Sequence, residues 1–292
     1  MASLKEVKAR IGSVNSTKKI TGAMKMVSSA KLKKAQMAIE NISPYQSRLN
    51  GILNNFLATE SDFQSDFSAV REVKNVAIVV FSSNSSLCGA YNSNVIKELN
   101  NVIKAERANA VQSITVYPVG KKVKDAVSKI AGIESVPVSV ELADHPSFEG
   151  ISAVTNEVMA KFLDKSYDKV IVIYHHLKNT AVQKLTTETF LPINLEADES
   201  ASASLGGDYI VEPNKAEILE SLLPKALRTK MYACLLDSNA SEHGARVVAM
   251  QVATDNANEL INELTVLYNK TRQQAITSEL LDIVGGAAAL QN

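Results

Sequence analysis

The hydrophobic pattern near the start of the chain is that of a long helix. Apolar residues recur with the 3-4-3 spacing of a coiled-coil seam at Leu4, Val7, Ile11 and Val14. No proline occurs before Pro44. The sequence therefore predicts a first helix over residues 3–57, bent near Pro44 because a proline ring has no N–H to give to the helical ladder.

The end of the chain has the same character. The stretch from Lys225 to Val284 contains no proline and a single glycine, Gly244. As one helix it would be about 90 Å long, at a rise of about 1.5 Å per residue. Pro213 is suited to the first position of this final helix, and Pro224 should bend it. Two helices of this length can pair as a long antiparallel coiled coil, with the middle of the chain as their connection.

The seam expected on the final helix changes character along its length. Counted in alternating steps of four and three, it passes through Leu260, Leu264, Leu267, Thr271, Gln274, Ser278 and Leu281. Its polar middle has two explanations, a local register shift or contact with a polar external surface. Arg272 and Gln273 lie beside that middle as hydrogen-bond donors. On the first helix Ile20, Met24 and Val27 also leave the seam, so Met24 is an adaptable apolar contact.

Between the long helices the pattern is that of an α/β domain. A continuous apolar run at 75–81 is typical of a strand buried on both faces. Further strands are expected at Ser113–Val119, Ser135–Val140 and Lys169–His175, separated by helices at Ala90–Arg107, Lys121–Ile130 and Ser147–Leu163. Val182–Phe190 follows a short loop and should return as an antiparallel edge strand. This alternation predicts a Rossmann-like domain with a mainly parallel five-stranded sheet.

The chain thus divides into three predicted parts, namely residues 1–57 (first coiled-coil helix), 58–208 (central α/β domain) and 209–292 (second coiled-coil helix). Within the central part, Glu196–Gly207 is a low-complexity segment that we expect to be mobile. The composition, with 46% hydrophobic residues over 292 positions, is sufficient for a packed core.

Charge is balanced overall but not locally. The formal net charge is zero, which argues against a general nucleic-acid-binding surface. Residues 1–40, however, carry nine basic and two acidic side chains, whereas residues 241–284 carry three basic and six acidic ones. The two helices should therefore attract each other, with positive charge left over. Lys31, Lys33 and Lys34 either face acidic groups of a partner or form a solvated surface.

No catalytic, cofactor or metal site is predicted. The loop after the first strand, Ser82–Gly89, has one glycine where a dinucleotide fold has three, and Gly120-Lys121-Lys122 lacks the rest of a phosphate-binding loop. His175 and His176 alternate on a strand and point to opposite faces. Cys88 has no organised histidine and aspartate set, so a small buried residue is expected. We therefore predict that the chain is not an enzyme by itself.

The remaining composition bears on location. The two cysteines, Cys88 and Cys234, have no metal-ligand spacing, and reduced thiols in an intracellular protein are expected. No apolar run approaches the roughly 20 residues needed to cross a bilayer, and the basic start lacks the apolar region of a signal peptide.

Two terminal motifs carry a family resemblance. The opening MASLKEVKARIGSVNSTKKITGAMKMVSSAKLKKAQ and the closing SEHGARVVAMQVATDNANELINELTVLYNKTRQQAITSELLDIVGGAAAL closely resemble the gamma subunit of F-type rotary ATP synthases, bacterial type. The resemblance extends over the whole chain and includes LCGAYN at Leu87–Asn92. It departs from the family at Asn84-Ser85-Ser86, where Asp-Arg-Gly is usual, and at Val211, where an aromatic residue is common.

The resemblance implies a rotor that couples rotation of the c ring to the catalytic beta subunits. It implies three alpha and three beta subunits, the epsilon subunit and the c-subunit ring as partners, with no cofactor and no membrane insertion. By position, Met24 would meet the acidic lever of beta, and Arg272 and Gln273 would form a polar catch. The remaining implied contacts are the helix tip in an upper bearing, from Ala287 through Ala288 to Leu290, and the foot residue Glu212 near the c ring.

The resemblance also places the protein at the cytoplasmic face of the bacterial inner membrane, as a peripheral subunit. Two alternatives remain at this point. One is a coiled-coil nucleic-acid-binding protein that uses the basic first helix, and the other is a nucleotide-dependent α/β enzyme. Salt-sensitive DNA binding by the isolated chain would favour the first, and saturable nucleotide binding would favour the second.

Overall fold

The computed structural model describes residues 3–59, 65–109, 111–193, 212 and 214–290. The predicted low-complexity segment 196–207 and Pro213 lie outside these residues. The chain forms two compact units, one made of residues 1–28 and 247–292 and the other of residues 29–246. The three-part division expected from the sequence stays a prediction.

Two long helices contribute to both units. α1 spans Leu4–Thr59 and continues through Pro44, and α6 spans Lys215–Leu290 and continues through Pro224. α6 begins after Asn214, whose side-chain Oδ1 accepts a hydrogen bond from the backbone N–H of Glu217 at 2.8 Å. An asparagine at this place satisfies one of the N–H groups that a helix start leaves free.

The second unit contains the sheet, whose order is β3-β2-β1-β4-β5. Its strands are β1 (Asn75–Phe81), β2 (Ser113–Val119), β3 (Glu134–Ser135), β4 (Lys169–Leu177) and β5 (Gln183–Leu191). The first four pair in parallel, and β5 pairs antiparallel with β4. The mainly parallel five-stranded sheet and its antiparallel edge are therefore confirmed.

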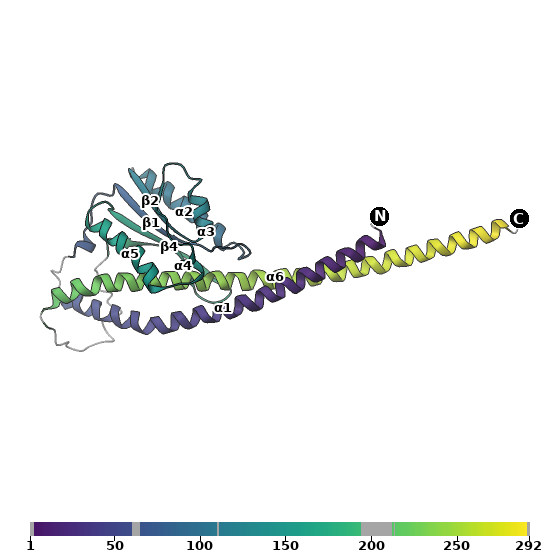
Figure 1. The fold of residues 1–292 in the computed structure, drawn as a ribbon, viewed down its shortest axis with the longest axis horizontal. Coiled ribbons are helices and arrows are strands. Elements are labelled where there is room, and N and C mark those ends of the chain that lie inside the picture. Colours follow the sequence, from purple (N-terminus) through teal and green to yellow (C-terminus); the bar gives the residue numbers. More distant parts are fainter. Residues whose placement is uncertain (1–2, 60–64, 110, 194–211, 213, 291–292) are drawn as a thin grey trace. The chain divides into compact units, whose positions relative to one another are not determined.

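Helices cover both faces of this sheet (Figure 1). They are α2 (Tyr91–Ala108), α3 (Lys121–Val127), α4 (Glu141–Asp144) and α5 (Phe148–Leu163), with a short 3-10 helix η1 (Asp66–Ser68) before β1. Val76, Ile78 and Val80 pack against α2 and α3, whereas the alternate residues of β1 face α5 and α6. The strand is apolar throughout because both of its faces are buried.

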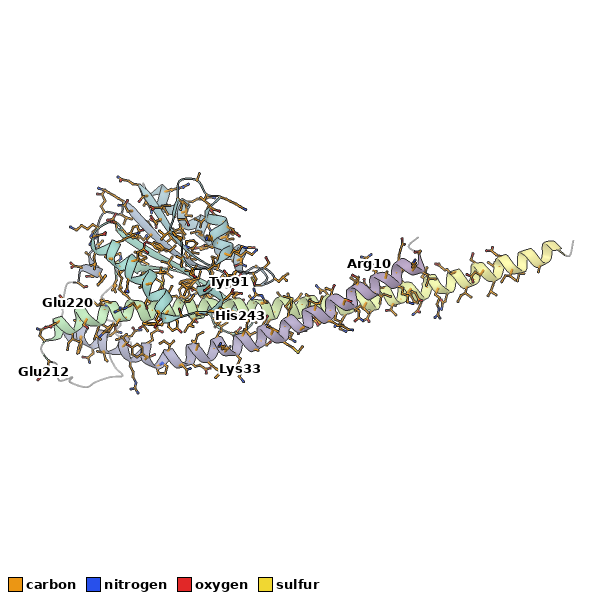
Figure 2. All side chains as sticks on the ribbon, viewed as in Figure 1. Arg10, Lys33, Tyr91, Glu212, Glu220 and His243 are labelled. Carbon is orange, nitrogen blue, oxygen red and sulfur yellow. The ribbon has the colours of Figure 1, made fainter. Side chains whose placement is uncertain are left out.

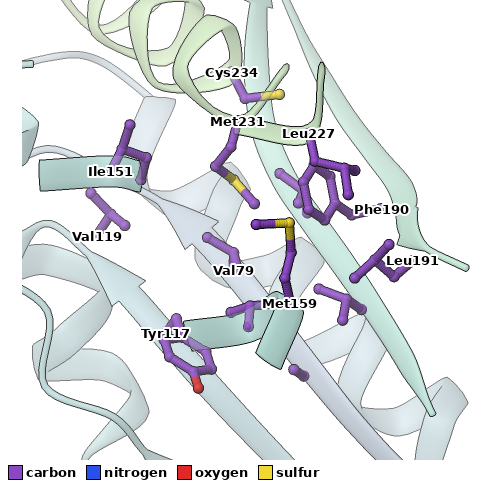
Figure 3. Packing of buried hydrophobic residues seen from close by; sticks show 14 of the residues in the cluster. Val79, Tyr117, Val119, Ile151, Met159, Phe190, Leu191, Leu227, Met231 and Cys234 are labelled. Carbon is purple, nitrogen blue, oxygen red and sulfur yellow. The ribbon is translucent and has the colours of Figure 1, made fainter. Parts of the chain in front are cut away.

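α6 is part of the main hydrophobic core of this unit. Leu227, Met231 and Leu235 of α6 lie in one buried cluster with Val79 of β1 and Phe190 of β5 (Figure 3). These residues are 0–4% exposed. The long helix therefore serves as one of the covering helices of the sheet over this stretch, in addition to its pairing with α1.

One predicted strand is much shorter than expected. The segment Ser135–Val140 was expected to be extended and paired, but β3 comprises only Glu134–Ser135 and is followed by irregular chain and α4. Pro137 explains the difference, since proline donates no hydrogen bond to a ladder. Val138, whose apolar side chain favoured the strand, is nevertheless buried at 7% exposure, because it packs into the core from the irregular segment.

Candidate partner-contact surface on the long helices

In the first unit, α1 and α6 pair in antiparallel fashion. The hydroxyl of Thr21 lies 2.9 Å from that of Thr254, and Lys25 contacts Gln251, so that numbers rise along one helix as they fall along the other. Val7 of α1 is 3% exposed. The N-terminal seam predicted from the spacing of Leu4 to Val14 therefore faces α6.

The seam predicted on α6 is partly wrong. Leu264 is 6% exposed as expected, but Leu267 and Leu281 are 44% and 66% exposed. The buried residues Met250, Ala257 and Leu264 are spaced by seven positions and keep the predicted register, with half-buried residues between them. The departure begins at Leu267, where the half-buried residue is Tyr268, one position later, and Leu281 lies beyond the end of the paired region.

The last part of α6 has no α1 residue opposite it among those that the structure describes. Leu4, the first residue of α1, precedes Thr21 by as many residues as Thr271 follows Thr254, so the antiparallel pairing places Leu4 level with Thr271. Arg272 and Gln273 follow at once and are exposed. Their place at the end of the paired region explains why the polar stretch of the predicted seam is not buried.

Large apolar side chains are exposed on this unpaired part of α6. They are Ile276, Leu280, Leu281, Ile283 and Val284, with exposed fractions from 48% to 68%. Ala287 is exposed as well, whereas the side chains of Ala288 and Leu290 lie outside those described. An isolated helix gains nothing from such residues in water, so this segment has the composition of a buried interface.

A second exposed apolar group lies on α1 around Met24. Met24 itself is half-buried, but Ile20, Met26 and Val27 are 58–71% exposed. The spacing predicts that Ile20 and Val27 leave the seam, but Met26 had no predicted role. The available signal was its apolar character at a position that the seam does not cover.

In the second unit, Lys31, Lys33 and Lys34 are exposed on α1. Figure 2 labels Lys33 on this helix. The residues between and beside them, Leu32 and Ala35, are buried against α6. None of the three lysines forms an ion pair within the part of the chain that the structure describes. The basic surface is therefore presented outward.

Glu212 also lies in the second unit, shortly before the start of α6, and is exposed. No described contact restricts its carboxylate. The structure thus leaves all of the predicted contact residues whose side chains it describes at least partly accessible, and it divides them between the two units.

The loops that a nucleotide would occupy are filled by the chain itself. Gly120 has φ +107°, and a Cβ there would lie 2.3 Å from the backbone O of Ser82. The side chain of Asn84 accepts from the N–H of Lys121 at 2.9 Å. Arg246 of α6 donates from Nη2 to Ser85 Oγ at 2.8 Å. Gly120 therefore permits a close approach of two loops, and no phosphate cradle is formed by them.

The buried titratable groups are held by an ion pair and by packing, although His175 Nδ1 has no hydrogen-bond partner among the described residues. Arg246 donates to Glu242 Oε1 at 2.6 Å, yet burial raises the pKa of Glu242, because desolvation outweighs the attraction. His175 stacks on Tyr91 with ring centroids 4.4 Å apart. Desolvation lowers the pKa of His175 to about 4 and, with the charge of Arg246, that of His243 to about 4. Both imidazoles are therefore neutral at pH 7.

The two cysteines, and His176 as the other histidine on β4, also have structural environments. Cys88 is 1% exposed, as predicted for a small buried residue, and burial raises the pKa of the Cys234 thiol. His176 Nδ1 lies 2.7 Å from Asp237 Oδ2, on the opposite face from His175. Among the described residues no group of three or more metal-ligating side chains occurs.

A family model described as ATP synthase matches residues 3–290. The gamma chain of ATP synthase from Phocaeicola vulgatus is 54% identical over 291 residues, covering 99% of this chain and 100% of the relative. The chain belongs to the ATP synthase gamma chain family. The gamma chain from Flavobacterium johnsoniae is 49% identical over 292 residues, with 99% of each chain covered.

Solved structures agree with the gamma chain fold. A chain of the Euglena gracilis mitochondrial ATP synthase (OSCP/F1/c-ring, rotational state 3) has a TM-score of 0.67 and 22% identity, covering 98% of this chain and 94% of its own. A chain of the Tetrahymena thermophila central stalk and c ring has a TM-score of 0.59 and 24% identity, covering 80% and 99%. At this identity the likeness concerns the fold.

Proposed function

We propose that this gamma chain is the central rotor shaft of a proton-translocating F-type ATP synthase. Membership of the gamma chain family supports the role, as do neighbours whose titles name a rotor and a central stalk. The single structural observation that favours it is the unpaired end of α6, where Ile276, Leu280 and Ile283 are exposed beyond the start of α1. A helix with this composition requires a surrounding partner.

The mechanism is mechanical coupling without bond chemistry by this chain. Rotation of a c ring turns the helix pair, and the pair presents different faces in succession to each beta subunit. Because contacts with one face favour one conformation of a beta subunit, its nucleotide affinity changes with rotor angle. The filled loops around Gly120 and Ser85 support a non-catalytic subunit, since they provide no place for phosphate.

Each predicted contact residue has a distinct chemistry in this role. Met24, beside the exposed Ile20 and Val27, would bind the acidic lever of beta through its apolar surface. Arg272 and Gln273 would donate hydrogen bonds to a beta-subunit loop. Lys31, Lys33 and Lys34 would attract acidic groups of the alpha and beta subunits.

The helix tip and Glu212, which belong to different units, would meet different partners. The tip, comprising Ala287, Ala288 and Leu290, would lie in an apolar bearing of the alpha and beta ring. Glu212 would face the c ring, near the epsilon subunit. No described helix has the length and hydropathy to span a bilayer. We therefore place the protein as a peripheral subunit at the cytoplasmic face of the bacterial inner membrane, held there by its partners.

Replacing Arg272 and Gln273 by alanine tests the role. The double variant should keep its helix, because alanine is the best helix former, while ATP-driven proton pumping by the assembled complex falls severalfold. The matched control is Asn262→Ala with Glu263→Ala, two exposed residues of α6 within the paired region. Membrane vesicles of the three complexes would be compared for ATP hydrolysis and for acidification.

Full pumping by the Arg272 and Gln273 variant would contradict the proposed catch. Equal loss in the control would show that any change of this helix surface impairs pumping, and the assignment to these two residues would fail. Failure of the tagged gamma chain to co-purify with alpha, beta and c subunits from its native membrane would contradict the rotor role itself.

A further inference from the structure

The seam of the first unit contains a polar layer. Its apolar positions on α1 end at Val14, and the next positions in the same heptad register are Lys18, Thr21, Lys25 and Ser28. Thr21 is 9% exposed and Ser28 is 4% exposed, so these are seam residues and not solvated ones. An apolar seam would be more stable, and the polar layer therefore requires an explanation.

The threonines of this layer satisfy each other across the helices. Thr21 Oγ1 lies 2.9 Å from Thr254 Oγ1. Thr21 Oγ1 is also 3.0 Å from the backbone O of Lys18, and Thr254 Oγ1 is 2.8 Å from that of Met250. One hydroxyl can therefore donate across the seam while the other donates to its own helix, so that both protons have acceptors.

One turn away, a second pair crosses the same seam. Lys25 Nζ donates to Gln251 Oε1. Gln251 Nε2 in turn donates to Asp255 Oδ1 and Oδ2, at 2.9 and 2.8 Å. Because Asp255 holds the amide nitrogen, the amide oxygen is directed toward Lys25. The acceptor that meets α1 is therefore oriented in advance.

We propose that the Thr21–Thr254 and Lys25–Gln251 pairs fix the axial register of the two helices. Apolar seam residues tolerate a shift by one heptad, because each then meets another apolar residue. In such a shift Thr21 would lie opposite Val247 or Ile261, and Lys25 would lose its oriented acceptor. Polar seam residues specify register in this way at some cost in stability.

The register sets where the partner-contact residues lie. A slip of one heptad would move α6 along α1 by about 10 Å, at about 1.5 Å per residue. Arg272 and Gln273 would then change their height relative to Met24. The register device is a property of the chain itself, whereas its effect on coupling rests on the proposed rotor function.

Cross-linking in the full-length chain tests the register directly. Val14 and Ile261 lie one heptad from Thr21 and Thr254, so cysteines at Val14 and Ile261 report the native register. Cysteines at Val14 and Tyr268 report a slip of one heptad. The native Cys88 and Cys234 are buried and can remain. Each reporter pair would be placed in the parent chain and in the variant Thr21→Val with Thr254→Val, and treated with a short thiol cross-linker.

The parent should give the native cross-link almost alone. In the double valine variant the ratio of slipped to native cross-link should rise about fivefold, as expected for one lost hydrogen bond, while thermal stability stays equal or increases. A higher slipped fraction without a loss of thermal stability distinguishes a change of register from a loss of folding. Thr21→Ser, with Thr254 unchanged, should keep the parent ratio of slipped to native cross-link, because serine retains the hydroxyl.

Thr265→Val is the matched control. Thr265 lies on the same helix as Thr254, and its hydroxyl donates to the backbone O of Ile261, but its side chain is exposed and outside the seam. An unchanged ratio in the double valine variant, or an equal rise in the Thr265 control, would overturn the proposal. In the assembled complex, the double valine variant should pump fewer protons per ATP hydrolysed. A higher ratio of slipped to native cross-link with normal pumping would support the register proposal and contradict its role in coupling.

Discussion

The two units of this chain differ in what they bury. In the unit of residues 29–246, every residue of β1 from Val76 to Phe81 is 0–1% exposed, and helices cover both faces of the sheet. In the unit of residues 1–28 and 247–292, the buried apolar side chains are Val7, Met250, Ala257 and Leu264, as far as the described residues go. The unit of residues 29–246 is stabilised by its own core, whereas the unit of residues 1–28 and 247–292 exposes much of its apolar surface.

This difference separates two uses of hydrophobic residues. A buried leucine stabilises the chain that carries it, by roughly 1.5–3 kcal/mol. An exposed leucine on α6 contributes to stability only after a partner covers it. Substitutions should therefore affect folding in one unit and assembly in the other.

The largest effect on folding is expected from Arg246→Met. It removes the partner of Glu242, whose side chain is 3% exposed, and it also removes the bond to Ser85. An unpaired buried carboxylate should lower the free energy of unfolding by about 3–5 kcal/mol at pH 7. Urea denaturation of the isolated chain measures this. A loss below 1 kcal/mol would show that Glu242 finds another partner or takes up a proton without cost.

A matched pair of leucines sharpens the comparison. Leu235→Ala in the core of the sheet unit should cost about 2–5 kcal/mol, because it leaves a cavity among residues that are fully buried. Leu281→Ala, at 66% exposure, should change the stability of the isolated chain by less than about 0.5 kcal/mol. It should weaken assembly with alpha and beta subunits instead. Equal losses of stability would mean that Leu281 is covered within the chain.

Acid should destabilise the sheet unit through His175 and His243. The folded pKa of each is about 4, below the ordinary value of 6.5, so the unfolded chain takes up protons first. The contribution of each neutral histidine to the free energy of unfolding should be fully present above pH 6.5. It should fall by about 1.4 kcal/mol per pH unit down to about pH 4. Below that pH these groups cause no further loss. Denaturation of His243→Gln between pH 7 and 4 should show a smaller slope than the parent, with the exposed His145→Gln as control.

The smallest effect on folding is expected from reversing Lys31, Lys33 and Lys34 to glutamate. Glutamate and lysine have similar helix propensities, and exposed charges contribute little, so circular dichroism and thermal unfolding should be nearly unchanged. Reconstitution with alpha and beta subunits should weaken, and more so at low salt, where screening is weakest. Assembly that is the same at two ionic strengths would indicate a solvated surface, which the sequence alone left open.

Much of this fold could be predicted from local pattern. β1 and β2 begin and end where the apolar runs do, because strands buried on both faces show a continuous signal. The antiparallel edge strand followed from the short loop before it. The third strand was predicted too long, because Val138 has the same apolar signal whether it lies in a strand or in irregular chain. Spacing and charge pointed to Met24, Arg272, Gln273 and the three lysines, whereas the roles of the first three, the helix tip and Glu212 came from the family resemblance.

The sequence by itself determined that two long helices flank an α/β domain, and that Leu4 to Val14 form a seam, since these depend on spacing within one element. Only the tertiary structure decided that the seam on α6 departs from the predicted register at Leu267, and that Thr21 meets Thr254. It also decided that Met231 of the long helix belongs to the core of the sheet. Such choices depend on contacts between residues distant in the chain, and the free energy of those contacts has no local signature.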